Sequence, residues 1–169
     1  MKNSAFSIRA ITDNDRAWVR EFMIEHWGAE MSVVRGEPFW PHQLPGFGAE
    51  TADGECIGLA TYRLLDDATG ELATIDSLRS GLGVGAALVH AVADAVRAQG
   101  RQRLIVVTTN DNLHALRFYQ RHGFVLAVLR VNALAASRTL KPQIPLVGLD
   151  GIPLRDEIEL EMRLGGASD

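Results

Sequence analysis

Three glycines, Gly81, Gly83 and Gly85, alternate with apolar residues in a short loop that could bind an anion. Glycine has no Cβ atom, so these positions accept left-handed backbone angles and let a ligand approach the main chain closely. A helix is predicted directly after them, and the first amide groups of a helix have no partners within it. Those amides and the positive end of the helix dipole favour a phosphate group. A tight turn that binds nothing is an equally good reading of the glycines alone.

The elements around this loop are predicted from the pattern of apolar residues. Residues 71–78 alternate and predict a strand, and the glycine loop of residues 80–85 leads into a helix over residues 84–99. A β-branched run at residues 104–109 predicts a second strand, which a helical crossover makes parallel to the first. A second helix follows over residues 112–123. The unit is therefore strand, loop, helix, strand, helix.

Two kinds of phosphate site compete for the loop. The letters GLGVGA fit a dinucleotide-binding pattern, with Gly81, Gly83 and Ala86 at its key positions and Asp111 as the acid for a ribose. This alternative predicts an NAD(P)-dependent oxidoreductase. Against it, a polar step that includes Arg79 separates the strand from the first glycine, and few further βαβ repeats are expected. The other possibility is an acyl-CoA site.

The helix after the second strand favours the acyl-CoA site. It carries a spaced set of residues, namely Asn112, Ala115, Tyr119, Gly123 and Phe124. With the glycine loop, this stretch resembles the Gcn5-related N-acetyltransferase superfamily over residues 71–124. The superfamily's loop pattern is Q/R-x-x-G-x-G/A, and Ser80 stands here at its first position. Residues 140–164 also resemble one bacterial branch of the superfamily.

The resemblance implies a fold, an activity and a cosubstrate. The expected fold is α/β, with a mixed, mostly antiparallel sheet of six or seven strands that splays between its fourth and fifth strands and is flanked by helices. The expected reaction transfers an acetyl group from acetyl-CoA to a primary amine by direct attack, without a covalent enzyme intermediate. A binding module that holds acyl-CoA without turnover, and a domain that binds no cofactor, remain alternatives.

The same resemblance assigns residues to acetyl-CoA. They are Ser77, Leu78, Ser80, Gly81, Leu82, Gly83, Val84, Gly85, Ala86 and Asn112. The resemblance implies that Ser77 and Leu78 hold the pantetheine arm and that the loop amides hold the pyrophosphate. Asn112 contributes its side chain. Asn112 is equally well explained as the cap of the second helix.

Tyr119 and Asp76 are the candidate catalytic residues. A phenol with an ordinary pKa of about 10 can give a proton to a departing thiolate while staying neutral at rest. A carboxylate can take a proton from the attacking amine, directly or through water. The alternatives are a packing role for Tyr119 and an acid without catalytic duty at the strand edge for Asp76.

Residues near the N-terminus are expected to line the acceptor site. The candidates are His26, Trp27, Arg35 and His42, and Glu30 is a further possible base. The histidines lack a metal-ligand spacing, and a single cysteine, Cys56, allows neither a thiolate cluster nor an internal disulfide. We therefore expect no metal.

Composition limits the other classes. The chain has 169 residues, 47% hydrophobic and 22% charged, which predicts a single domain over residues 1–169. A net charge of −4 argues against a nucleic-acid partner. No apolar run approaches the roughly 18 residues of a membrane span, so we expect a cytoplasmic protein with no membrane partner. The acceptor is expected to be a small molecule or a peptide, and a homodimer is possible, as in many relatives.

The remaining segments complete the expected sheet. Strands are predicted over residues 5–10, 47–51, 56–64, 124–131 and 157–164, and a short helix over residues 133–140. A helix that contains Trp18 should end at Gly28, and prolines predict an irregular segment over residues 31–47. In the last strand, the row Glu157, Glu159 and Glu161 is expected to face solvent.

Overall fold

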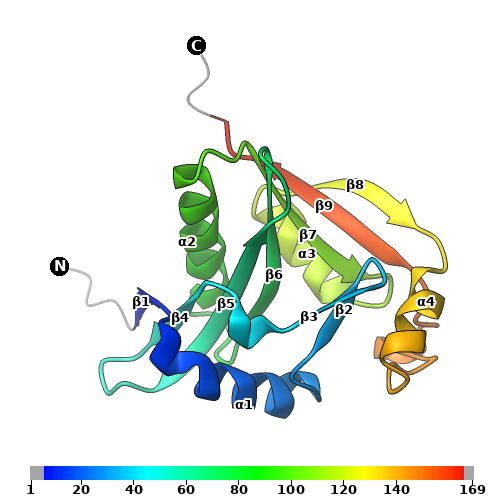
Figure 1. Ribbon diagram of the computed structural model, residues 1–169, viewed down its shortest axis with the longest axis horizontal. Coiled ribbons are helices and arrows are strands. Elements are labelled where there is room, and N and C mark those ends of the chain that lie inside the picture. Colours follow the sequence, from blue (N-terminus) through cyan, green and yellow to red (C-terminus); the bar gives the residue numbers. More distant parts are fainter. Residues whose placement is uncertain (1–5, 166–169) are drawn as a thin grey trace.

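The computed structural model describes residues 6–165, and its centre is one seven-stranded sheet. The strands lie in the order β1-β4-β5-β6-β7-β9-β8, and the β6–β7 pair is parallel whereas the other neighbours are antiparallel (Figure 1). Their bounds are β1 (Ser7–Ala10), β4 (Gly46–Glu50), β5 (Cys56–Leu64), β6 (Thr69–Ser77), β7 (Arg103–Thr109), β8 (Val125–Arg130) and β9 (Glu157–Arg163). This is the mixed, mostly antiparallel sheet that the sequence predicts.

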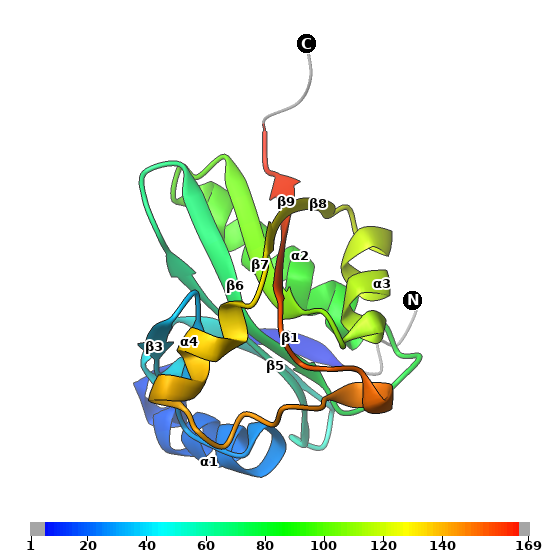
Figure 2. The same ribbon diagram turned by 90° about the vertical axis from the view of Figure 1, so that its right-hand side faces the viewer.

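Helices cover both faces of the sheet. The helices are α1 (Arg16–Trp27), α2 (Val84–Ala98), α3 (Leu113–Arg121) and α4 (Ala133–Leu140), with short 3-10 turns at Asp13–Asp15, Pro41–Gln43 and Leu149–Gly151. α2 and α3 lie on one face, and α1 and α4 lie on the other (Figure 2). Within residues 6–165, none of the helices combines the length and apolar character that a membrane crossing needs.

The main core lies between α2 and the sheet. Apolar residues at helical spacing place Leu88, Val92 and Val96 on one face, and all three are fully buried. Each such side chain contributes about 1.5–3 kcal/mol on burial. Gly70 of β6 allows close contact, because a Cβ atom there would lie 2.5 Å from a methyl group of Val96. The core therefore fixes α2, and with it the glycine loop, against the middle of the sheet.

The sheet splays between its fourth and fifth strands, β6 and β7. Their parallel register runs from Thr69 opposite Arg103 to Leu72 opposite Val106 and stops there. Beyond that point β7 continues to pair with β9, and β6 continues to pair with β5. Beyond that point, the facing edges of β6 and β7 therefore do not pair with each other.

The segment of residues 31–47 corrects the sequence prediction of an irregular loop. It contains a two-stranded hairpin of β2 (Ser32–Val34) and β3 (Glu37–Phe39). Arg35 and Gly36 form its tip with left-handed φ angles of 54° and 72°. Pro38 is accommodated because the hairpin has only two strands, and a strand edge needs no amide donor. An arginine at positive φ is uncommon, so the turn gave no clear sequence signal.

The acidic row of β9 is a second correction. Glu157 and Glu159 are only 2% and 6% exposed, so they do not form a solvated face. Arg35 donates its backbone amide to Glu157 at 3.0 Å, and Arg130 pairs with Glu159 at 2.7 Å. The alternation of residues predicted strand β9 correctly. It did not predict that the β2–β3 hairpin covers the second face of this strand.

Candidate active site

A cavity of about 1020 Å³ opens where β6 and β7 separate. Its walls come from both strands, from α3, and from α1, β2 and α4 on the opposite face of the sheet. Residues 72–77 of β6 and residues 106–109 of β7, from the last pair of the two strands onward, line it. The cavity therefore passes through the sheet at the point where strand pairing fails.

The glycine loop adjoins this cavity at Gly85. Gly81 and Gly83 adopt left-handed φ angles of 81° and 79°, and Gly83 caps α2. A Cβ atom at Gly85 would lie 3.1 Å from the ring of Phe118, so this glycine lets α2 approach α3. In the described part of the chain, the amides of residues 81–86 have no internal acceptor with hydrogen-bond geometry. Unpaired amides at a helix N-terminus attract an anion.

Tyr119 lies between the core and the cavity. It is 6% exposed, and its ring packs edge-on against Phe118 and Phe124 at centroid distances of 5.5 Å. Burial raises the pKa of this phenol above its usual value. The helix that carries it begins at Asn112, whose side-chain oxygen accepts the amide hydrogen of Ala115 at 3.0 Å. Asn112 thus caps the helix, and it also lines the cavity.

Asp76 and Ser77 reach the same cavity from β6. Among residues 6–165, Asp76 has no hydrogen-bond or ion-pair partner for its carboxylate, whereas Ser77 donates its hydroxyl to the carbonyl of Arg79 at 3.2 Å. Leu78 is placed differently from Asp76 and Ser77. Its amide donates to Ile57 at 2.9 Å, its side chain is 44% exposed, and it is outside the cavity lining. The amide of Leu78 is therefore committed to the sheet.

The candidate acceptor residues separate into two groups. His26 and Trp27, at the end of α1, line the cavity. Arg35 and His42 do not line it, so the structure does not bring these two together with His26 and Trp27. The hairpin turns Arg35 toward Glu71, which it meets at 2.7 Å, and His42 lines a separate pocket of about 260 Å³ beside Pro41–Gln43.

Four ionisable residues in the lining were not predicted as site residues from the sequence, namely Asp111, His114, Lys141 and Glu157. Asp111 had been considered only as a ribose acid. It accepts the amide hydrogen of Leu149 at 2.9 Å, which holds the segment after α4 beside α3. Lys141 is one of only two lysines in the chain, and that rarity was the one available signal for it. No group of three or more His, Cys, Asp or Glu residues suited to a metal occurs within residues 6–165.

The chain matches a known family over most of this region. The model of the acetyltransferase (GNAT) family matches residues 14–124. The chain belongs to this family. The match covers the glycine loop, Asp76 and Tyr119, and the splayed sheet agrees with it.

Individual similar proteins extend the comparison. The uncharacterized protein YxbD of Bacillus subtilis strain 168 is 38% identical over 146 residues, which cover 86% of this chain and 91% of YxbD. An IAA acetyltransferase from Bacillus cereus has a TM-score of 0.71 at 21% identity, with 94% and 99% of the two chains covered. A GNAT family acetyltransferase from Elizabethkingia anophelis with acetyl-CoA bound has a TM-score of 0.66 at 20% identity, with 95% and 99% covered.

These findings give no support to the dinucleotide alternative. The family model that spans the glycine loop is an acetyltransferase model. A doubly wound nucleotide-binding sheet is mostly parallel, whereas one pair in this seven-stranded sheet is parallel.

Proposed function

We propose that this GNAT protein transfers an acetyl group from acetyl-CoA to a primary amine. The observation that carries the proposal is the cavity at the β6–β7 splay, because Gly85, Tyr119 and the unpartnered carboxylate of Asp76 all line it. Family membership supports an acyltransferase, and the relative from Elizabethkingia anophelis binds acetyl-CoA.

The fit of acetyl-CoA rests on two features of the backbone. The amides of residues 81–86 have free hydrogens where a pyrophosphate would need donors, and Gly81 and Gly83 present no side chain to obstruct it. The separated edge of β6 offers main-chain groups to the amide groups of a pantetheine arm, as an added strand would. Acetyl-CoA supplies the activated acyl group, held as a thioester.

Asp76 and Tyr119 divide the proton transfers between them. Asp76 accepts a proton from the ammonium form of the acceptor, so the nitrogen gains a free electron pair. That pair forms the new C–N bond to the acetyl carbon as the C–S bond breaks. Tyr119 then gives its hydroxyl proton to the departing sulfur. The acetylated nitrogen loses its second proton as the amide forms, and that proton restores the phenol through solvent, while Asp76 releases its own proton to solvent. Since burial favours the neutral phenol, the proton is present when the thiolate forms.

Release of free thiol from acetyl-CoA in the presence of a panel of amines tests this proposal. We expect thiol release that depends on the amine, together with an acetylated product 42 mass units (roughly, one acetyl group replacing hydrogen) heavier than the acceptor. Binding of acetyl-CoA without turnover on a broad panel would instead indicate a non-catalytic acyl-CoA module. Stabilisation by NAD(P) alone would contradict the proposal.

A further inference from the structure

The side of the cavity that α1 and α4 line contains one basic lysine, Lys141. It directly follows α4, and its ammonium donates a hydrogen bond to the backbone carbonyl of Met31 at 3.1 Å. Among the described residues that line the cavity, Lys141 is the only lysine or arginine. The side chain thus places a positive charge in a cavity that is otherwise lined by apolar, neutral and acidic groups.

This ammonium has unused donor capacity. A lysine ammonium has three donors, and the contact with Met31 uses one. No ion pair involves Lys141 within residues 6–165. Burial lowers the pKa of Lys141, as expected for a cation that lacks a nearby carboxylate. A ligand anion would relieve this unfavourable burial.

The surroundings of Lys141 would strengthen such a contact. From α4 to β9, the same segment contributes Leu134, Ile144, Pro145 and Leu154 to the cavity lining. Apolar walls of this kind lower the local dielectric constant, and charges attract each other more strongly there than in water.

The nearby carboxylates are already engaged. Glu157 accepts the backbone amide of Arg35 at 3.0 Å, and Asp111 accepts that of Leu149 at 2.9 Å. Asp76 is the lining carboxylate without a protein partner. One cavity therefore holds a carboxylate without a partner at Asp76 and an ammonium with free donors at Lys141. This pair of groups is complementary to a ligand that has both a positive and a negative charge.

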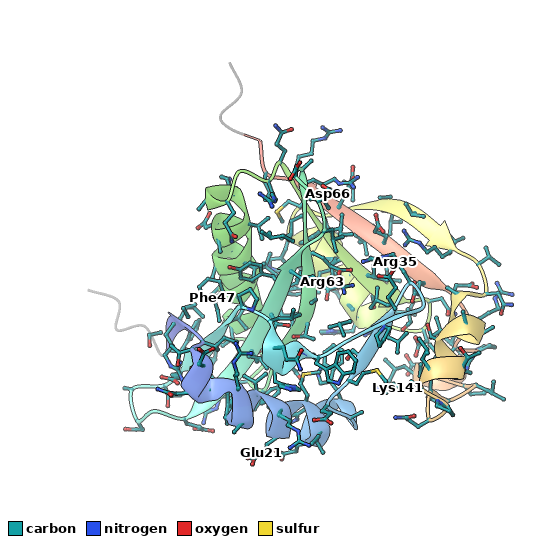
Figure 3. All side chains as sticks on the ribbon, in the orientation of Figure 1. Glu21, Arg35, Phe47, Arg63, Asp66 and Lys141 are labelled. Atoms are coloured by element: carbon teal, nitrogen blue, oxygen red, sulfur yellow. The ribbon has the colours of Figure 1, made fainter. Side chains whose placement is uncertain are left out.

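The two charges lie on the acceptor part of the cavity. Lys141 lies beside α4 and binds the segment after α1, on the face of the sheet opposite α2 and the glycine loop (Figures 2 and 3). Asp76 lies on β6, at the splay between the two faces. An acceptor amine at Asp76 would therefore have the rest of its molecule on the Lys141 side.

We propose that Lys141 binds an oxyanion of the acceptor, so that the substrates are primary amines that also carry a carboxylate or a phosphate group. Amino acids, peptides with a free carboxylate and phosphorylated amines share this chemistry. The inference rests on the proposed acetyl transfer and names its substrate class.

Matched pairs of acceptors test the inference through thiol release. One arm compares each of the common L-amino acids with its amide, and the other compares phosphoethanolamine with ethanolamine. We expect at least one anionic member to have a kcat/KM at least about tenfold above that of its neutral partner, the size of a good charge-assisted contact. The arm that shows the preference identifies the oxyanion.

Lys141→Met then tests whether this residue is responsible. The variant should raise the KM of the preferred acceptor about tenfold and leave the KM of acetyl-CoA and the neutral acceptors unchanged, whereas Lys141→Arg should retain most of the preference. Arg163→Met is the matched control, because it removes the same charge from an exposed residue at the end of β9. Thermal melting verifies that each variant is folded.

The outcomes separate the two proposals. Acetylation of amines with no preference for the anionic member in any pair would overturn the inference and leave acetyl transfer standing. A preference that survives in a folded Lys141→Met variant would also overturn it. If no amine is acetylated, acetyl transfer itself fails and the inference fails with it. If Lys141→Met does not fold, the wild-type preference and the Lys141→Arg variant decide.

Discussion

Tyr119 owes its chemical character to burial. Its pKa is raised because the ring lies between α3 and the sheet, where an ionised phenolate would lose its hydration. The hydroxyl therefore remains protonated beyond the usual phenol pKa of about 10. A general acid for a thiolate needs this property, since it must hold its proton at the pH where the acceptor amine becomes neutral.

Replacing Tyr119 by phenylalanine separates catalysis from packing. The ring contacts remain, so Tyr119→Phe should bind acetyl-CoA with a KM within about threefold of wild type. The kcat should fall by about 100-fold, the usual size of a lost general acid. Steady-state thiol release measures both values.

Tyr62 provides the matched control for that experiment. It is the other tyrosine of the chain, is 8% exposed, and accepts a hydrogen bond from Gln99 away from the cavity. Tyr62→Phe should therefore leave kcat unchanged. Equal kcat values for Tyr119→Phe and wild type would remove Tyr119 from the acid role.

Single residues were predictable where a local pattern or the family resemblance placed them. Tyr119 and Asp76 line the cavity together, as expected of residues placed by the resemblance. The direction of Arg35 was not predictable, because it depends on a non-local contact with Glu71, which no local pattern encodes. Lys141 was missed for the same reason, since the cavity gains it only when the segment after α4 folds back.

At the scale of elements, the junction of the loop and α2 is the feature on which the proposed binding of acetyl-CoA rests. Gly83→Val would place a β-branched residue at a φ of 79°, and its side chain would occupy the space before the free amides. We expect loss of measurable acetyl-CoA binding by calorimetry, in addition to a strain cost of about 1–2 kcal/mol.

Gly100→Val controls for backbone strain alone. Gly100 has a φ of 81°, and a Cβ atom there also meets nothing within 4 Å, but it lies after the other end of α2. The two variants should lose similar stability, and only Gly83→Val should lose binding. Undiminished acetyl-CoA affinity in Gly83→Val would move the anion site elsewhere.

The β2–β3 hairpin is held over the sheet by a buried ionic cluster. Glu71 of β6 is 2% exposed and accepts hydrogen bonds from Arg35 at the hairpin tip and from Arg63 of β5 (Figure 3). Glu71→Ala would leave both guanidinium groups without this partner, and the free energy of unfolding should fall by about 3–5 kcal/mol.

Urea denaturation measures this change, and Asp94→Ala serves as its control. Asp94 forms an exposed pair with Arg97 on α2, and the loss of such a pair should cost less than about 1 kcal/mol. A similarly small effect for Glu71→Ala would contradict a structural role for the cluster.

Element prediction succeeded where periodicity and termination signals agreed. The sequence places the second helix of the fold at residues 84–99, and α2 spans Val84–Ala98. It places a strand at residues 104–109, and β7 spans Arg103–Thr109. The β2–β3 hairpin was not predicted, because Pro38 argues against a strand. The burial of Glu157 was not predicted either, because it depends on that hairpin. Local patterns thus gave the elements, whereas burial depended on their assembly.

At the scale of the whole molecule, acetyl-CoA should stabilise the fold because it spans elements that are separate in the sequence. The glycine loop, β6 and α3 all contribute to its proposed site. A ligand at 100 times its Kd adds about 2.7 kcal/mol, which corresponds to a rise in Tm of roughly 5–10 °C for a chain of this size. Thermal melting with acetyl-CoA measures this shift, and NAD(P) at equal concentration should give none.

The topology was predictable only in part. A helical crossover required β6 and β7 to be parallel, and the family resemblance implied the splay between them. The position of β9 between β7 and β8 was not available from local patterns, because it depends on pairing between strands far apart in the sequence. The side of the cavity that α1, β2 and α4 build together was correspondingly its least predictable part.

A crystal structure with coenzyme A bound tests the central claim most directly. Our account predicts that the pyrophosphate oxygens accept hydrogen bonds from amides within residues 81–86, with the sulfur beside the Tyr119 hydroxyl in the gap between β6 and β7. A pyrophosphate bound elsewhere, or a sulfur remote from Tyr119, would contradict it.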